Sequence, residues 1–125
     1  MEQFKILVVE DEPDIREAMV DALTSIGSRV ISAKDGREGL QVALAEEPDL
    51  ILLDLIMPHM TGTQVLEKLR QDPWGKTVKV VVLTAMDDVQ SVAITHEYHI
   101  SDYIIKSQNS LGDILGKVRN ILHTT

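Results

Sequence analysis

Five short apolar runs alternate with longer segments of helical periodicity along the chain. Runs that are apolar on both faces are typical of strands buried in a parallel sheet. A repeating strand-helix pattern predicts a parallel sheet with right-handed crossovers and helices on both faces. We therefore expect an α/β fold with strands at Ile6 to Val9, Arg29 to Ala33, Leu50 to Leu53, Val78 to Leu83 and Asp102 to Ile105.

The segments that follow the first two runs carry signals for the start and end of helices. The first helix is expected to begin at Asp14, directly after Pro13, and to end before Gly27. Asp35 is the expected N-cap of the second helix. The inward face of this second helix is predicted to consist of Leu40, Ala43 and Leu44.

Three further helices are expected in the second half of the chain. One runs from about Thr63 to Gln71 and is stopped by Asp72-Pro73. The segment Asp87 to Tyr98 is the weakest, because it contains several residues of modest helix propensity. Ser110 is expected to cap the last helix, whose apolar stripe comprises Leu111, Ile114, Leu115, Val118, Ile121 and Leu122.

The composition fits one globular domain spanning residues 1–125, with 44% hydrophobic residues and no linker, repeat or second domain. The formal net charge of -8 argues against direct binding of nucleic acid, which requires clustered Lys and Arg. The chain has no cysteine, which excludes disulfides and thiolate metal sites. No segment has the length of a membrane span and no cleavable leader is evident, so we expect a soluble, cytoplasmic protein.

Polar groups that can carry chemistry follow four of the five expected strands. Glu10 and Asp11 follow the first strand, Asp54 the third, Thr84 the fourth and Lys106 the fifth. The carboxyl ends of parallel strands share one edge of the sheet, and in the strand order 2-1-3-4-5 the first and third strands are neighbours. Asp11 and Asp54 are therefore expected to converge in a crevice at that edge.

Carboxylates crowded at one site repel each other and resist desolvation unless a cation joins them. Oxygen ligands without His or Cys suit a hard cation, and a shallow site with few protein oxygens favours Mg²⁺ over Ca²⁺. We expect Asp11 and Asp54 to bind the ion directly and Glu10 to act through a water. For Glu10, Asp11 and Glu12 alone, capping of the next helix and complementation of its dipole explain the acids equally well. An unpaired Asp54 after a buried strand would be costly.

A carboxylate beside Mg²⁺ can attack phosphorus and form an acyl phosphate when the transferring oxygens are neutralised by cations and hydroxyl donors. Lys106 would supply a point charge and Thr84 a short donor for these oxygens. Taken alone, Thr84 is more often a cap and Lys106 a surface charge. Only the shared edge of the sheet gives the two residues a common role.

Four segments together resemble the receiver domains of two-component response regulators. They are VVEDEP at 8–13, LILLDLIMPHMTG at 50–62, VVLTA at 81–85 and DYIIK at 102–106. The match covers almost the whole chain, and the combination in this order is specific. The resemblance implies a flavodoxin-like, doubly wound fold with the strand order 2-1-3-4-5. It also implies a signalling switch that modifies only itself, rather than an enzyme.

By this resemblance, Asp54 accepts a phosphoryl group from a phosphohistidine on a sensor histidine kinase or a histidine phosphotransfer protein. Mg²⁺ is held by Asp11, Asp54 and the main-chain carbonyl of Ile56, with Glu10 close by. The downstream partner is a separate target protein or a fused output domain, and the resemblance also allows a phosphorylation-dependent homodimer.

The resemblance also assigns the switch. Thr84 and Lys106 contact the phosphoryl oxygens, and Tyr103 is the aromatic switch residue. Movement of Thr84 toward the phosphoryl group leaves room for the Tyr103 ring to turn inward, which changes the surface near the last strand.

Three positions depart from the usual receiver pattern. Glu10 stands where Asp is commoner, and its side chain is one methylene longer. Ser107 replaces a Pro that usually follows a cis bond, and a non-proline cis bond costs about 2.5 to 4 kcal/mol. The bond after Lys106 is therefore either trans or strained. His99-Ile100 replaces Gly-Ala, so the preceding helix is expected to end without its usual left-handed glycine.

Other classes of protein fit the sequence less well. The main alternative is a pseudo-receiver that binds partners without phosphorylation, which the joint presence of Asp54, Thr84 and Lys106 disfavours. A phosphatase resembling haloacid dehalogenases needs a second Asp two residues after the first, where this chain has Ile56. A flavin-binding module needs a phosphate-binding loop after the first strand, where the acids would repel the phosphate.

Overall fold

Five parallel strands form one sheet in the order β2-β1-β3-β4-β5. The structure is a computed structural model that describes residues 3–85, 93 and 97–123. The strands are β1 (Lys5–Val9), β2 (Arg29–Ala33), β3 (Leu50–Leu53), β4 (Lys79–Thr84) and β5 (Asp102–Ile105). The predicted fold and strand order are confirmed, and the predicted strands agree to within one residue at each end.

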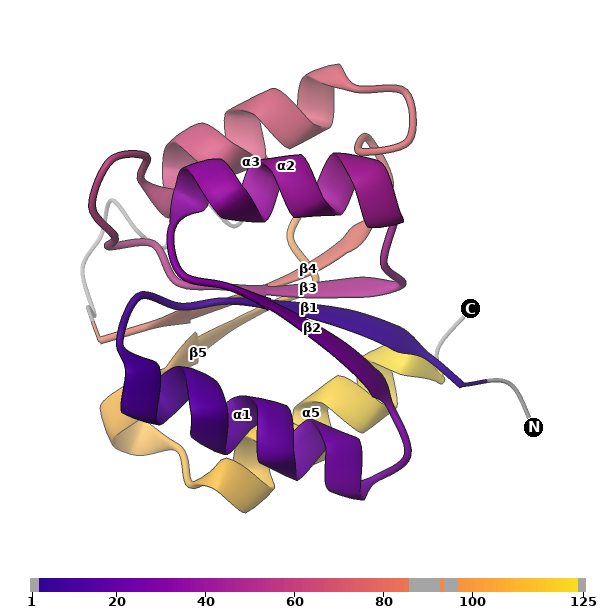
Figure 1. The fold of residues 1–125 in the computed structure, drawn as a ribbon, viewed down its shortest axis with the longest axis vertical. Coiled ribbons are helices and arrows are strands. Elements are labelled where there is room, and N and C mark those ends of the chain that lie inside the picture. Colours follow the sequence, from indigo (N-terminus) through magenta and orange to yellow (C-terminus); the bar gives the residue numbers. More distant parts are fainter. Residues whose placement is uncertain (1–2, 86–92, 94–96, 124–125) are drawn as a thin grey trace.

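Helices cover both faces of the sheet, as the crossover pattern predicts (Figure 1). Helices α2 (Gly36–Glu46) and α3 (Gly62–Gln71) lie on one face, and α1 (Pro13–Ser25) and α5 (Leu111–Leu122) lie on the other. A short 3-10 turn, η1 (Lys106–Gln108), joins β5 to α5. The helix expected from Asp87 to Tyr98 falls largely outside the described residues.

Each face of the sheet carries its own apolar core. On the side of α2 and α3, the sheet residues in the core are Leu7, Val9, Ala33, Ile51, Leu53, Val80 and Val82. On the side of α1 and α5, they are Ile6, Val8, Leu50, Leu52, Val81, Leu83 and Ile104. Because successive side chains of a strand point to opposite faces, the runs that looked uniformly apolar in the sequence supply both cores.

Side chains cap the starts of α2 and α5, as the sequence predicted, and of α3, where it predicted none. Asp35 Oδ1 accepts a hydrogen bond of 2.9 Å from the Glu38 amide and so caps α2. Ser110 caps α5 as predicted. Thr61 forms an unpredicted capping box with the third residue of α3. This cap explains why α3 begins at Gly62 and not at Thr63.

Two leucines that the sequence placed inward are exposed, so those predictions were wrong. Leu44 of α2 is 42% exposed and Leu111 of α5 is 40% exposed. The sheet-facing side of α2 is a narrow line of small residues, Gly36, Gly39 and Ala43. A Cβ on Gly39 would lie only 2.7 Å from a methyl group of Val9, so this helix approaches β1 closely and Leu44 is turned aside. Leu111 is the first residue of its helix, where the stripe begins at the surface.

The structure shows the backbone conformation at His99 and at the bond before Ser107, the two places where the sequence suggested an unusual backbone. His99 itself adopts the left-handed conformation, with φ 53°, so the chain turns before β5 without a glycine. Non-glycine residues adopt this conformation at a cost of roughly 1 to 2 kcal/mol. No described peptide bond is cis, so the Lys106–Ser107 bond is trans. Within the described residues, no helix combines the length and apolar character that crossing a bilayer requires.

The capping box of α5 makes stability depend on pH. The main-chain and side-chain hydrogen bonds with Ser110, together with the charge of Lys117, hold the pKa of Asp113 below its usual value of 3.8. A lowered pKa stabilises the fold above pH 3.8, and this contribution is lost as the pH falls through the value in the folded protein. We expect Asp113→Asn to lose this acid-dependent part of the unfolding free energy. Urea unfolding of both proteins across the acid range tests this, and parallel pH profiles would contradict it.

Candidate functional site

The carboxyl ends of β1 and β3 hold two buried acidic side chains. Glu10 is 2% exposed and Asp54 is 6% exposed. The sheet fixes both backbones, because the Glu10 amide donates to the Ala33 carbonyl and the Asp54 amide to the Val9 carbonyl, each at 3.1 Å. Parallel pairing of β1 with β3 therefore places the two carboxylates side by side without any special loop.

Lys106, which follows β5, joins these two carboxylates. Its Nζ donates to Glu10 Oε1 at 2.5 Å and to Asp54 Oδ2 at 3.1 Å. The side chain of Lys106 is 17% exposed, so the three charged groups are largely withdrawn from water. Burial acts to lower the pKa of Lys106, but the hydrogen bonds and charges of Glu10 and Asp54 outweigh it, so the pKa is raised above 10.5. Lys106 therefore remains a cation at neutral pH.

Asp11 completes a cluster of three acids. One carboxylate oxygen from each of Glu10, Asp11 and Asp54 lies within 4.8 Å of the others. The convergence of Asp11 and Asp54 predicted from the strand order is therefore confirmed. A group of hard oxygens at this spacing has the chemistry to hold a small divalent cation.

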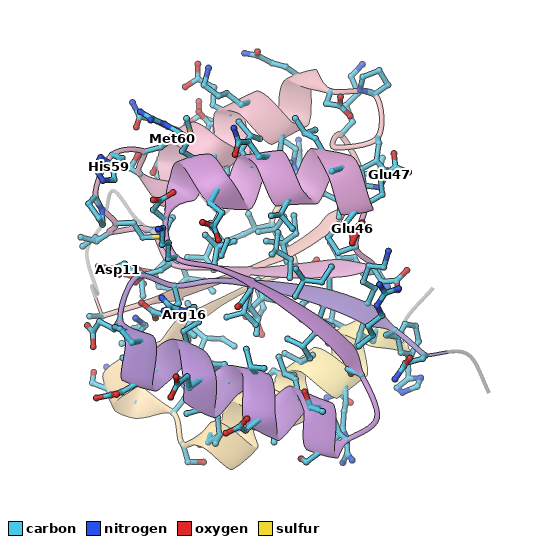
Figure 2. The ribbon with its side chains drawn as sticks, in the orientation of Figure 1. Asp11, Arg16, Glu46, Glu47, His59 and Met60 are labelled. Atoms are coloured by element: carbon cyan, nitrogen blue, oxygen red, sulfur yellow. The ribbon has the colours of Figure 1, made fainter. Side chains whose placement is uncertain are left out.

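Arg16, on α1, contacts the backbone of the acidic loop, and the sequence did not predict this contact. Its Nη1 donates to the carbonyl of Glu10 at 2.9 Å and to that of Asp11 at 3.5 Å. Figure 2 shows Arg16 and Asp11 at the same end of the molecule. An Arg one turn into the helix that follows an acidic loop is the signal that could have found it. This contact holds the backbone that carries two of the acids.

Asp54 is also supported by its own loop. Its Oδ1 accepts a hydrogen bond of 3.2 Å from the Ile56 amide, while the Ile56 side chain is 56% exposed. Gly62 closes the loop: a Cβ there would lie 2.4 Å from the Asp54 carbonyl oxygen and 2.6 Å from Leu55 Cα. Close approach of two backbones, rather than a left-handed conformation, therefore requires glycine at this position.

Thr84 and Tyr103 lie on neighbouring strands. Thr84 is fully buried at the carboxyl end of β4, in register with Ile105, the residue before Lys106. Tyr103 pairs in register with Val82, and its half-buried ring packs against the core on the side of α2 and α3. Thr84 is the last residue of β4, and Tyr103 lies in β5, which leads directly to Lys106. Both residues are therefore on the side of the sheet formed by β4 and β5.

Comparison with known proteins agrees with this geometry. The sequence profile of the response regulator receiver domain matches residues 6–119. The chain belongs to this family. Its receiver domain fold is similar to that of the chemotaxis protein CheY4 of Vibrio cholerae, with a TM-score of 0.88 at 25% identity over 96% of this chain and 99% of that one. The BeF3-activated receiver domain of Klebsiella pneumoniae RstA gives a TM-score of 0.85 at 28% identity, covering 96% and 99% of the two chains.

Curated relatives are longer than this receiver domain. A probable transcriptional regulator, ycf27, of Porphyridium aerugineum is 38% identical over 98% of this chain and 49% of its own length. Response regulator ArlR of Staphylococcus aureus is 32% identical over 94% of this chain and 52% of its own length. The chain spans about half the length of the curated relatives it matches.

Replacing Lys106 removes the ammonium group that pairs with the Glu10 and Asp54 carboxylates. We expect Lys106→Met to lower the unfolding free energy of the metal-free protein by about 1 to 3 kcal/mol, because buried carboxylates lose their partner. Adding Asp54→Asn should recover part of the loss by removing one negative charge. Urea unfolding in EDTA measures both effects, with Lys34→Met, an exposed lysine, as the control. Equal losses in the single and double variants would contradict this account.

The close approach at Gly62 gives a second test. Gly62→Ala should lower the unfolding free energy by about 1 to 3 kcal/mol, because the new methyl group must displace the backbone of Asp54 and Leu55. The matched control is Gly116→Ala, in the interior of α5, where a Cβ meets nothing within 4 Å. That change should raise stability by about 0.5 to 1 kcal/mol. Thermal and chemical unfolding of the two variants would show whether they move in opposite directions.

Proposed function

We propose that Asp54 is the acceptor of a phosphoryl group donated by a phosphohistidine, and that this modification switches the surface near β5. The observation that carries the proposal is the position of Asp54. It is a buried carboxylate held by Lys106 on one oxygen and by the Ile56 amide on the other, beside two further acids. Burying a carboxylate is costly unless it is paired, and a cluster of buried, interacting charges is characteristic of functional sites.

The transfer is an in-line displacement at phosphorus. A carboxylate oxygen of Asp54 forms a bond to phosphorus while the P–N bond to the donor imidazole breaks. The electron pair of that bond leaves with the nitrogen, and the donor ring, which carries a proton on its other nitrogen, is released as neutral imidazole. Lys106 neutralises charge that spreads over the phosphoryl oxygens, and the Thr84 hydroxyl donates a hydrogen bond to one of them. The chain modifies itself, so we do not class it as an enzyme.

We further propose that the acidic cluster binds Mg²⁺ through Asp11, Asp54 and the main-chain carbonyl of Ile56, with Glu10 contributing through water. The fit rests on the donor set, three carboxylates whose oxygens lie within 4.8 Å of one another. When bound, the ion would supply positive charge that draws the phosphoryl oxygens and the carboxylate together. Arg16 keeps the loop that carries Glu10 and Asp11 in place for this purpose.

The partners follow from the chemistry. The donor would be a sensor histidine kinase or a histidine phosphotransfer protein. The downstream partner would be a separate target protein or an output domain fused to this domain. The greater length of the curated relatives supports a fused output domain. Thr84 and Tyr103 would transmit the change, because Thr84 lies on β4 and Tyr103 on its neighbour β5. The same proposal includes a homodimer that forms between two phosphorylated chains.

The test is incubation with a small-molecule phosphodonor and Mg²⁺, followed by intact mass measurement. We expect the wild-type chain to gain one phosphoryl group, and Asp54→Asn or a sample in EDTA to gain none. Asp21→Asn, an exposed aspartate of α1, is the matched control and should behave as the wild type does. Thr84→Ala should still be modified, but more slowly, since one donor to the transferring oxygens is lost.

Other outcomes have clear meanings. A chain that gains nothing with any phosphodonor would refute the proposal and favour a binding module that works without phosphorylation. A gain that survives Asp54→Asn would place the acceptor elsewhere. Size-exclusion chromatography of the modified sample reads the oligomeric state in the same experiment.

A further inference from the structure

Arg70, on α3 and outside the acidic site, donates four hydrogen bonds to main-chain carbonyls. Its Nε donates to Tyr98 at 2.9 Å and its Nη1 to Gly75 at 2.7 Å and Val78 at 3.0 Å. Its Nη2 donates to His99 at 3.4 Å. The side chain is half-buried, and this burial lowers the pKa of Arg70. None of the four acceptors is a carboxylate, so Arg70 is not a partner in an ion pair through them.

The four carbonyls belong to two segments that are distant in sequence. Gly75 and Val78 lie in the chain that leads into β4, and Tyr98 and His99 lie in the chain that leads into β5. One guanidinium therefore joins the starting points of two adjacent strands. Directly after this junction, the Ser101 amide donates to the Val80 carbonyl at 2.7 Å, at the start of the pairing of β5 with β4.

The pairing of these two strands determines where the polar groups at their other ends lie. β5 has four residues and, in the sheet formed by the described residues, is an edge strand paired with β4. Their register sets Thr84 opposite Ile105, and Lys106 follows. A slip of one residue would move Lys106 by about 3.3 Å along the strand and reverse the direction of every β5 side chain.

We propose that Arg70 is a positioning residue for phosphoryl transfer, which fixes β5 against β4 at the amino ends of the two strands and so places Lys106 relative to Thr84 at their carboxyl ends. This inference rests on the function proposed above. We call the four hydrogen bonds of Arg70 to these two segments the clamp. The six residues of β4 separate the clamp from the acidic site by about 20 Å, so Arg70 acts only through the strands.

The geometry requires arginine. The guanidinium is a planar fork with five donors, and here three nitrogens reach carbonyls of both segments at once. A lysine ammonium keeps the charge but has three donors on a single atom, so it cannot reproduce the four hydrogen bonds that the guanidinium makes from three nitrogens. His99 adds a reason for a clamp, because its left-handed backbone is an unfavourable conformation for a non-glycine residue.

The decisive variant is Arg70→Lys, with Arg37→Lys on the exposed face of α2 as the matched control. Amide hydrogen exchange is measured first, without phosphodonor or metal. We expect amides of residues 98–105 to exchange about tenfold faster than in the wild type, beyond any change in β1 and β3, because the local opening becomes easier. A uniform increase across all strands, or no increase, would overturn the proposal.

The second measurement is the rate of phosphorylation by a small phosphodonor. At saturating Mg²⁺, Arg70→Lys should be about tenfold slower, because small displacements of catalytic groups have large effects on rate. The Mg²⁺ concentration for half-maximal rate should stay unchanged, since the acids lie on β1 and β3. An unchanged rate, or a loss of rate caused by weaker Mg²⁺ binding, would contradict a positioning role.

Two further results distinguish a failure of the clamp from a failure of the proposed function. If the wild type takes up no phosphoryl group, the proposed function fails, and hydrogen exchange still decides whether Arg70 fixes β5 to β4. If Arg70→Lys does not fold, the wild-type protein supplies the test through the Arg70 Nε–H proton in NMR. Slow solvent exchange of this proton is expected for a part-buried hydrogen bond to the Tyr98 carbonyl, and fast exchange would overturn the clamp.

Discussion

Repulsion among Glu10, Asp11 and Asp54 is the constraint on which the rest of the site depends. Parallel pairing of β1 with β3 brings the acids together whether or not their charges favour it. Lys106 offsets part of this repulsion through hydrogen bonds to two of them. Three carboxylates against the Lys106 ammonium and the nearby Arg16 guanidinium still leave an excess of negative charge, which favours a further cation and disfavours the approach of an anion without one.

Lys106, whose positive charge partly compensates the acids, follows an edge strand of the sheet. The acids follow β1 and β3, which are paired on both sides, whereas Lys106 follows β5, which pairs only with β4 among the described strands. Ile104 anchors β5 because its side chain is fully buried in the core on the side of α1 and α5. After the strand, Asn109 Nδ2 donates to the Ile105 carbonyl at 2.9 Å. The electrostatic balance at the acids thus depends on packing and hydrogen bonds made elsewhere in the fold.

Local sequence signals predicted most of this arrangement. Apolar runs gave the strands, Asp35 and Ser110 gave helix starts, and the topology brought Asp11 to Asp54. The wrong prediction for Leu44 comes from packing between elements: Leu44 is exposed because α2 approaches β1 closely at Gly39. The main-chain contacts of Arg70 span up to 29 residues and leave no periodic trace in the sequence. Periodicity reports which face of an element is apolar, but not how closely two elements approach.

Two departures from the usual receiver pattern bear on the same side chain. Ser107 follows Lys106 through a trans bond, so proline geometry does not set the direction of the chain there. Glu10 reaches Lys106 Nζ at 2.5 Å, and an Asp at this position, shorter by about 1.5 Å, would leave Lys106 to Asp54 alone. The extra methylene therefore supplies a contact that holds Lys106 in this backbone. Because an ammonium has three donors, Lys106 can keep Glu10 while it turns a proton toward a group on Asp54.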